Sequence, residues 1–192
     1  STRTVSPLAP AGYSIVGMGD FDGDGRNDVL WTSAARDLWL WRSLGTDFTS
    51  SFVDSYPAGW DPVGVGDANG DGRADILWRN TGSGAFAYWQ MNGAAITRIV
   101  NIAAAAPASY RLAAARDITG DGRVDPLWAN DTIRDIWLWQ SGNDVYTPRQ
   151  LESYPSGWLT VDAGDMDADG DADILWRGPA GEFVWWVMQA GA

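Results

Sequence analysis

Short apolar stretches alternate with polar turn sequences along the whole chain. Residues 57–106 show the pattern clearly: runs rich in β-branched and aromatic residues at 60–66, 74–79, 85–91 and 95–102 are separated by turn signals at 69–72, 81–84 and 92–93. Such runs predict strands joined by tight turns. No segment has a convincing helical period, and we interpret the alanine run 103–106, which precedes Pro107, as a loop. The stretch therefore predicts a four-stranded antiparallel meander.

This pattern occurs four times. An Asp-Gly-rich string reads GDFDGDG from Gly19, GDANGDG from Gly66, RDITGDG from Arg116 and GDMDADG from Gly164, so the first aspartates lie 47, 50 and 48 residues apart. Each string is followed by two tryptophans at repeated positions, the first being Trp31, Trp78, Trp128 and Trp176 and the second Trp41, Trp89, Trp139 and Trp186. Four-stranded units that recur every 40 to 50 residues, about the length of one blade, are typical of a β-propeller.

The predicted fold is therefore all-β, a propeller of four blades that each form a four-stranded antiparallel sheet. The blades cover approximately residues 10–56, 57–106, 107–154 and 155–192 of a single domain. The fourth unit has only three predicted strands, and residues 2–5 resemble residues 97–100 of the second unit's fourth strand, so residues 1–9 are expected to close the last blade. Such closure removes exposed sheet edges. Two alternatives stay open: half of an eight-bladed ring made from two chains as a homodimer, or a fragment of a larger propeller.

Composition narrows the chemistry. The formal net charge of −12 has the wrong sign for nucleic acid or an anionic membrane as a partner. The chain has no His, Cys or Lys, which excludes histidine-based and thiol catalysis, Schiff-base chemistry and His- or Cys-ligated zinc. No apolar run approaches the 18 or so residues of a membrane-spanning helix. Residues 1–11 lack a basic segment followed by an apolar stretch, so any signal peptide is expected to have been removed already or never to have been present. The remaining catalytic option is a carboxylate pair.

The four Asp-Gly strings are predicted to bind Ca²⁺. Each has carboxylate or other oxygen-bearing side chains at alternate positions and glycines that allow a sharp turn, as Ca²⁺ requires. In each loop we predict side-chain ligands together with one backbone carbonyl. They are Asp20, Asp22, Asp24, Asp28 and the Arg26 carbonyl; Asp67, Asn69, Asp71, Asp75 and the Arg73 carbonyl; Asp117, Thr119, Asp121, Asp125 and the Arg123 carbonyl; and Asp165, Asp167, Asp169, Asp173 and the Asp171 carbonyl. About four Ca²⁺ are expected, one for each blade.

Two other interpretations of the loops were weighed. Asp and Gly favour solvated turns without any metal, but four such loops in register make this less plausible. An EF-hand shares the spacing of the first aspartates, yet it needs a glutamate at loop position 12 and a helix on each side. Position 12 is tryptophan in all four loops, inside a predicted strand, so the EF-hand interpretation fails.

Over essentially all 192 residues, these motifs resemble the FG-GAP, or VCBS, repeats of integrin α-subunit propellers, secreted bacterial proteins and certain fungal propeller lectins. The resemblance implies a secreted, calcium-stabilised propeller and says little about its ligand. The third unit departs from the pattern, because Thr119 replaces a carboxylate and Pro126 follows the last ligand. We predict that the third calcium site is the weakest.

The tryptophans leave the ligand open. The eight at repeated positions are expected to form the core between blades. Tyr13, Trp60, Tyr110 and Trp158 lie at the entry of each blade and are the candidate ligand-binding residues, with structural packing as the alternative. The sequence favours a noncatalytic recognition module for a glycan or an extracellular protein. A structural or spacer domain of a larger secreted enzyme or adhesin is the alternative, and an enzyme is not expected because most acids belong to the loops.

Overall fold

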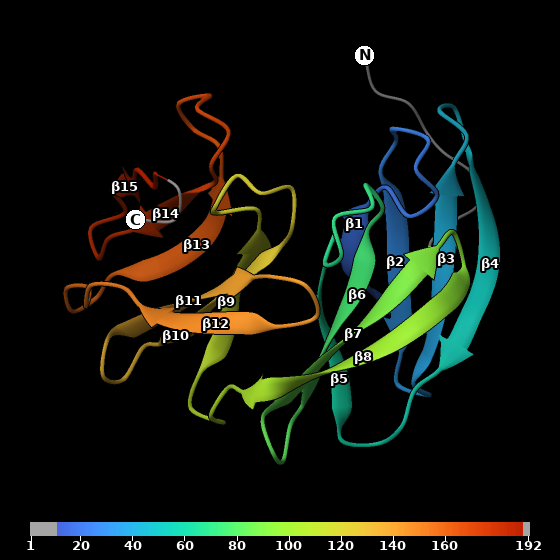
Figure 1. The fold of residues 1–192 in the computed structure, drawn as a ribbon, viewed down its shortest axis with the longest axis horizontal. Helices are drawn as coiled ribbons and strands as arrows, with labels where there is room; N and C mark the ends of the chain where they lie inside the picture. Colours follow the sequence, from blue (N-terminus) through green and yellow to red (C-terminus); the bar gives the residue numbers. More distant parts are fainter. Residues whose placement is uncertain (1–10, 190–192) are drawn as a thin grey trace.

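The chain forms four antiparallel sheets that follow one another in sequence order, a four-bladed propeller arrangement (Figure 1). The computed structural model describes residues 11–189. Within this range, the first three sheets have four strands and the last has three. The predicted all-β propeller of four blades is therefore confirmed. The closing strand expected at residues 1–9 lies outside the described residues.

The strands pair with their sequence neighbours in every blade. The first blade contains β1 (Tyr13–Gly19), β2 (Asp28–Ser33), β3 (Asp37–Ser43) and β4 (Phe48–Ser55), and the second β5 (Trp60–Gly66), β6 (Asp75–Asn80), β7 (Ala85–Asn92) and β8 (Ala95–Ala105). The third contains β9 (Arg111–Arg116), β10 (Asp125–Asn130), β11 (Asp135–Ser141) and β12 (Tyr146–Gln150), and the last β13 (Leu159–Gly164), β14 (Asp173–Arg177) and β15 (Phe183–Trp186).

One expectation for the second blade was wrong. The alanine run 103–106 was interpreted as a loop, but β8 continues to Ala105, which pairs with Ala85 across a register shift in β7. Ala106 then donates its backbone N–H to the Gly84 carbonyl. The strand continues because the β7 backbone beside it still offers partners, which the sequence of the run alone does not indicate.

The first strand of every blade bends at the same place. Its pairing with the second strand shifts register at one bulged residue, which is Val16, Val63, Ala113 or Val161 in the successive blades. A bulge increases the local twist of a strand. These four strands lie innermost, and contacts link β1 to β5, β5 to β9 and β9 to β13.

The hydrophobic core lies between successive blades, in three clusters that each combine two neighbouring sheets. Six of the eight repeated tryptophans lie in or against these clusters, which confirms their predicted role between blades. Trp31 and Trp41 are buried in the first blade, outside the three clusters. We call the side of a blade that packs on the next blade its forward face, and the opposite side its rear face. The forward face uses four equivalent positions, which are at most 2% exposed in three blades: Phe21, Leu30, Leu38 and Leu40; Ala68, Leu77, Phe86 and Tyr88; and Ile118, Leu127, Ile136 and Leu138.

A backbone hydrogen bond accompanies each of these three junctions. The N–H groups of Ala74, Val124 and Ala172 donate to the carbonyls of Asp20, Asp67 and Asp117, the first aspartates of the preceding blades, at 2.7, 2.6 and 2.9 Å. The Asp-Gly loops are thereby part of the contact between blades. The described residues include no helix that is long and apolar enough to cross a membrane.

Candidate metal loops and an aromatic pocket

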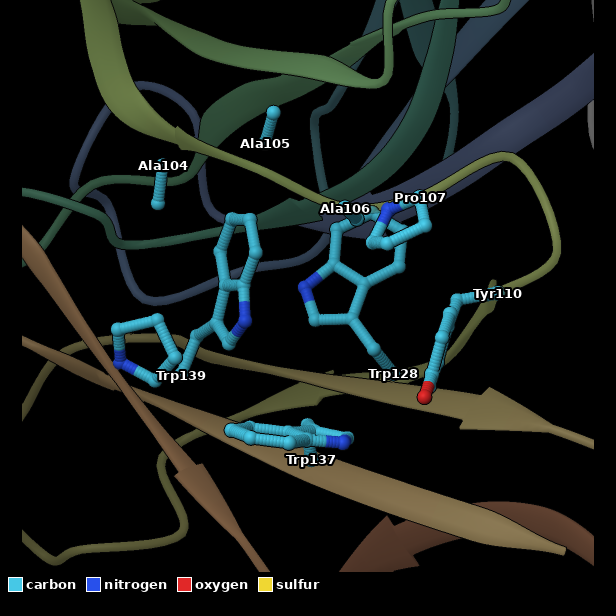
Figure 2. A pocket seen from close by; sticks show the side chains of 9 residues that line it. Ala104, Ala105, Ala106, Pro107, Tyr110, Trp128, Trp137 and Trp139 are labelled. Atoms are coloured by element: carbon cyan, nitrogen blue, oxygen red, sulfur yellow. The ribbon is translucent and has the colours of Figure 1, made fainter. Parts of the chain in front are cut away.

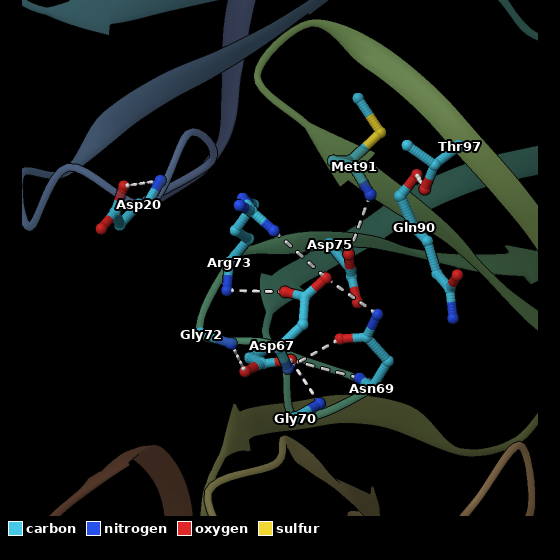
Figure 3. Close-up of polar contacts among 12 residues, drawn as sticks. Asp20, Asp67, Asn69, Gly70, Gly72, Arg73, Asp75, Gln90, Met91 and Thr97 are labelled. Atoms are coloured by element: carbon cyan, nitrogen blue, oxygen red, sulfur yellow. Dashed lines mark hydrogen bonds and ion pairs between the residues drawn. The ribbon is translucent and has the colours of Figure 1, made fainter.

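The four Asp-Gly loops connect the first strand of each blade to the second, so they lie at the same end of all four sheets. The first aspartate of each loop organises the backbone around itself. In the second loop, Asp67 accepts the Gly70 N–H at 2.7 Å through Oδ1 and the Gly72 N–H at 2.7 Å through Oδ2 (Figure 3). Asp20, Asp117 and Asp165 accept from equivalent backbone groups. Each loop thus has a defined shape set by its own side chain.

The last aspartate of each loop is buried and ties the loop to the third strand or, in the last blade, to Met188 just after that strand. Asp75 is completely buried and accepts the backbone N–H groups of Ala68 and Met91, each at 3.0 Å. Asp28, Asp125 and Asp173 are held in the same way. Burial raises the pKa of Asp75 to about 7, and nearby Asp71 and Asp67 act in the same direction. A cation in the loop would favour the ionised carboxylate, because opposite charge lowers the pKa of an acid.

Three of the predicted side-chain ligands come together in the first and fourth loops. Asp20, Asp22 and Asp28, and likewise Asp165, Asp167 and Asp173, each offer one carboxylate oxygen, and the oxygens of each group lie within 4.8 Å of one another. Hard oxygen donors at this spacing suit Ca²⁺. The third aspartate lies apart from these groups: Asp24 Oδ2 is 2.6 Å from Nη1 of Arg26, and Asp169 Oδ1 accepts the Asp171 N–H at 3.0 Å.

The second and third loops differ from this arrangement. Asn69 replaces a carboxylate in the second loop, and its side chain exchanges hydrogen bonds with Asp71. In the third loop, both the hydroxyl and the backbone N–H of Thr119 donate to Asp125 at 3.0 Å. Asp121 accepts from the Ser141 hydroxyl. In the third loop, the Thr119 hydroxyl thus points its proton at Asp125. That this loop is the weakest calcium site stays a prediction.

Three of the four residues whose backbone carbonyls are predicted ligands extend their side chains toward the preceding blade. The Arg73 side chain lies over Gly23 and the Arg123 side chain over Gly70, while Asp171 contacts Gly120. Arg26, in the first blade, instead forms its ion pair with Asp24. The ligand role of these four carbonyls stays a prediction.

A separate feature is an aromatic pocket of about 390 Å³ between the second and third blades (Figure 2). Alanines of β8 and Pro107 form one side, and β10–β12 the other. The pocket is lined by Ala104, Ala105, Ala106, Pro107, Tyr110, Trp128, Trp137, Trp139 and Pro148. Trp128 and Trp139 are nearly completely buried, whereas Trp137 and Tyr110 are half-buried. The exposed ring surface of the pocket therefore belongs mainly to the last two.

Asp135 fixes these two rings. It accepts hydrogen bonds from the Tyr110 hydroxyl at 2.5 Å, Trp137 Nε1 at 2.8 Å and Gln150 Nε2 at 2.9 Å. Burial raises the pKa of Asp135, but these hydrogen bonds outweigh it and hold the pKa below its ordinary value. The first blade repeats the arrangement, since Tyr13 and Trp39 both donate to Asp37. An ionised carboxylate with three donors positions side chains and is a poor proton donor.

Three of the four candidate ligand residues line hollows at equivalent places. Tyr110 lines the pocket just described, Trp60 a hollow of about 230 Å³ in the second blade and Trp158 one of about 100 Å³ in the last. Tyr13 lies at the corresponding position of the first blade. The sequence analysis missed Trp137, although the spacing Asp-x-Trp that it shares with Asp37 and Trp39 places both residues on one side of a strand.

Comparison with known proteins agrees with the fold. The family model described as FG-GAP-like repeat matches residues 20–78, 67–128 and 117–176. No curated protein matches the chain. A solved structure of the Tc holotoxin pore from Photorhabdus luminescens is similar over 96% of this chain and 9% of its own, with 16% identity and a TM-score of 0.67. Raptor from Chaetomium thermophilum is similar over 93% of this chain and 16% of its own, with 12% identity and a TM-score of 0.53. The chain thus spans a small part of each.

Proposed function

Because the chain belongs to the FG-GAP-like repeat family, we propose that it is a noncatalytic recognition module, secreted and stabilised by Ca²⁺, that binds a carbohydrate in the aromatic pocket of its third blade. The calcium part rests on the donor chemistry of the loops. The carbohydrate part rests on one observation, the half-buried Trp137 and Tyr110 rings held by Asp135 at the mouth of an apolar pocket.

The metal would act on structure. Asp20, Asp22 and Asp28 in the first loop, and Asp165, Asp167 and Asp173 in the fourth, would supply its carboxylate ligands. Bound Ca²⁺ supplies positive charge that offsets the repulsion among these acids. Asp28 also accepts the backbone N–H of Ser43 in the third strand, and Asp173 that of Met188 just after the third strand. The ion would therefore connect the loop to three parts of a blade. Extracellular calcium modules bind at about 10⁻⁴ to 10⁻³ M, which is the reason we place the protein outside the cell.

The pocket fits a sugar ring better than a charged ligand. Its walls are indole, phenol, proline and alanine groups, and aromatic faces of this kind pack against the apolar face of a pyranose. Asp135 uses its oxygens for Tyr110, Trp137 and Gln150, so the two rings keep their orientation without a ligand. A preformed site of this type saves the cost of ordering side chains on binding.

A glycan array in calcium-containing buffer, followed by calorimetry with the best binder, tests the carbohydrate proposal. We expect Trp137→Ala to weaken binding at least tenfold, because it removes the stacking surface. Trp137→Phe keeps a ring and should retain most of the affinity. A thermal melt of each variant serves as the folding control. A silent array, or full affinity in Trp137→Ala, would reject carbohydrate binding at this pocket.

A second candidate function is a structural or spacer domain in a larger secreted protein. It is favoured by the comparison with solved structures, in which the similar region forms 9% and 16% of much longer chains. Binding of an extracellular protein instead of a carbohydrate would still make the propeller a recognition module. A silent array together with intact calcium binding would favour the spacer or a protein partner.

A further inference from the structure

The forward face of the last blade lacks the partner that the other three forward faces have. Its four positions are occupied by Met166, Leu175, Phe183 and Trp185. Met166, Phe183 and Trp185 are 47%, 59% and 51% exposed, although the equivalent residues of the other blades are at most 2% exposed. Leu175 is half-buried. The last blade thus presents an apolar face of the composition that elsewhere packs on a further blade.

The backbone of the last blade is also suited to such a neighbour. Gly19 and Gly66, which end the innermost strands of the first two blades, lie so close to Ala74 and Val124 that an added Cβ would approach them to 2.6 and 2.9 Å. Gly164 holds the same position in the last blade, and an added Cβ there would meet none of the described residues within 4 Å. Gly164 therefore leaves room for the backbone of another blade to approach closely.

The rear face of the first blade is exposed near its innermost strand, although Trp31 and Trp41 on the same face are buried. Met18 is 63% exposed, while the equivalent Val65, Ala115 and Ala163 are 6–7% exposed. Asn27 is exposed, whereas Ala74, Val124 and Ala172 at its position are buried and donate the backbone hydrogen bonds between blades. Within the described residues, no such bond joins Asn27 to Asp165, and β1 and β13 lack the packing that links the other innermost strands.

Charge makes these two faces complementary. Arg73 and Arg123 extend from rear faces over the acidic loops of the preceding blades. The first blade has Arg26 at this position, and its side chain is 53% exposed. The loop of the last blade contains Asp165, Asp167 and Asp169. Arg26 is therefore the cation that a matching junction would place over that loop.

We propose that the forward face of the last blade docks on the rear face of the first blade of a second copy of this chain, and that two such junctions close a ring of eight blades. Each junction would repeat the contacts already present between neighbouring blades. One twofold axis generates both junctions, so neither face is left unpaired. Among the described residues of one chain the two faces do not pack on each other: contacts link the innermost strands β1 to β5, β5 to β9 and β9 to β13, but no comparable packing joins β13 back to β1 (Figure 1).

Mass measurement by light scattering in calcium buffer tests the assembly. We expect twice the chain mass of 20.8 kDa. Trp185→Glu should give the single-chain mass, because it places a charge on an apolar contact. Ile133→Glu is the matched control, since Ile133 is 60% exposed on the third blade and outside both faces, and it should keep the double mass. A single-chain mass for the unmodified protein, an open series of larger masses, or a double mass in Trp185→Glu would overturn the proposal.

Disulfide trapping identifies the partner. The chain has no cysteine, so Gly164→Cys and Asn27→Cys introduce single thiols at positions that touch in the proposed junction. When the two single variants are mixed and oxidised with diamide, which is itself reduced, their thiols should form a disulfide that joins one chain of each variant. In the double variant, a disulfide within one chain would show closure of a four-bladed ring and overturn the proposal. Absence of any disulfide would also overturn it.

Discussion

Gly84 lies in the turn between β6 and β7, and two features of its surroundings exclude a larger residue. Its φ of 72° is in the left-handed region, and a Cβ would lie 2.0 Å from the Ala106 carbonyl oxygen. We expect Gly84→Ala to lower the free energy of unfolding by about 1–3 kcal/mol, as strained backbone costs.

Gly82→Ala is the matched control in the same turn. Gly82 has no positive φ, and its nearest neighbour to an added Cβ is Asn80 Oδ1 at 3.5 Å. The control should change the free energy by about 0.5 kcal/mol or less. Urea titrations of both variants measure the difference, and equal effects would contradict the assignment of strain to Gly84.

The residue types predicted part of the candidate metal loops. The rest depends on which groups form hydrogen bonds with each other in the folded loop. Aspartates at alternate positions indicated the loops, and in two of them the structure brings three carboxylates together. The sequence could not show that Asp24 turns to Arg26 or that Thr119 donates to Asp125. Those choices depend on which neighbour is nearest once the loop has folded.

At the scale of elements, an ion pair within the third blade is connected to the last blade by a hydrogen bond. Arg111 on β9 donates to both oxygens of Asp131, through Nε at 2.8 Å and Nη2 at 3.1 Å, and Nη2 also donates to the Thr160 hydroxyl on β13 at 2.8 Å. Tyr154 donates to Asp131 at 2.7 Å. The hydrogen bonds from Arg111, together with that from Tyr154, hold the pKa of Asp131 below its ordinary value.

This pair predicts a loss of stability in acid. Because the folded protein has the lower pKa, the contribution of Asp131 is complete above the unfolded pKa of about 3.9 and is lost as the pH falls through the folded pKa. Asp131→Asn should therefore be less stable than the unmodified protein at pH 7, and the difference should shrink below about pH 4.

Urea titrations between pH 7 and 3 check this expectation. Asp54→Asn is the control, because Asp54 is exposed on β4 and, among residues 11–189, its side chain accepts a hydrogen bond only from the adjacent Ser55 N–H. A pH-independent difference between Asp131→Asn and the unmodified chain would show that the ionised side chain is not responsible.

The predicted strand boundaries agree closely with the structure where the sequence contains clear turn residues. In the second blade the predicted strands 60–66 and 85–91 correspond to β5 and β7, while β8 runs three residues past its predicted end. Turn residues define where a chain reverses, whereas the length of an outer strand depends on the partner strand beside it. The same reason explains why Trp137 was missed: its exposure depends on how far the second blade's β8 and Pro107 extend over it.

At the scale of the whole molecule, the net charge of −12 is concentrated in the loops at one end of the sheets, and four Ca²⁺ would reduce it to −4. Millimolar Ca²⁺ should add about 1 kcal/mol for each site of the expected affinity. In a chain of this size each kcal/mol raises Tm by about 2–4 °C. A chelator should therefore lower Tm clearly.

Calorimetric titration of chelator-stripped protein should find close to four sites, with the third the weakest. Thr119→Asp restores a carboxylate in that loop and should raise its affinity. Sodium chloride at equal ionic strength is the control for simple screening of charge. A Tm that does not respond to chelator, or that responds equally to sodium, would contradict specific calcium binding.

The repeated spacing predicted the number of blades because each unit carries its own strands and turns. It did not predict where the first and last blades lie relative to each other. Their relative position depends on the angle between successive sheets, which no single unit determines. The exposed Met18 and Trp185 therefore became visible only in the assembled structure.

The junctions between blades have one further consequence, for how such a chain can change in length. The first two blades each offer a glycine, a buried apolar set and one backbone acceptor in front, and the second, third and last blades each offer a small or β-branched residue with a backbone donor behind. A duplicated copy of the second unit, inserted in tandem, would meet compatible surfaces on both sides without any substitution. Gene duplication or deletion of a segment of about 48 residues can thus alter the circumference of the ring in whole steps, while a fraction of a unit would leave an unmatched face.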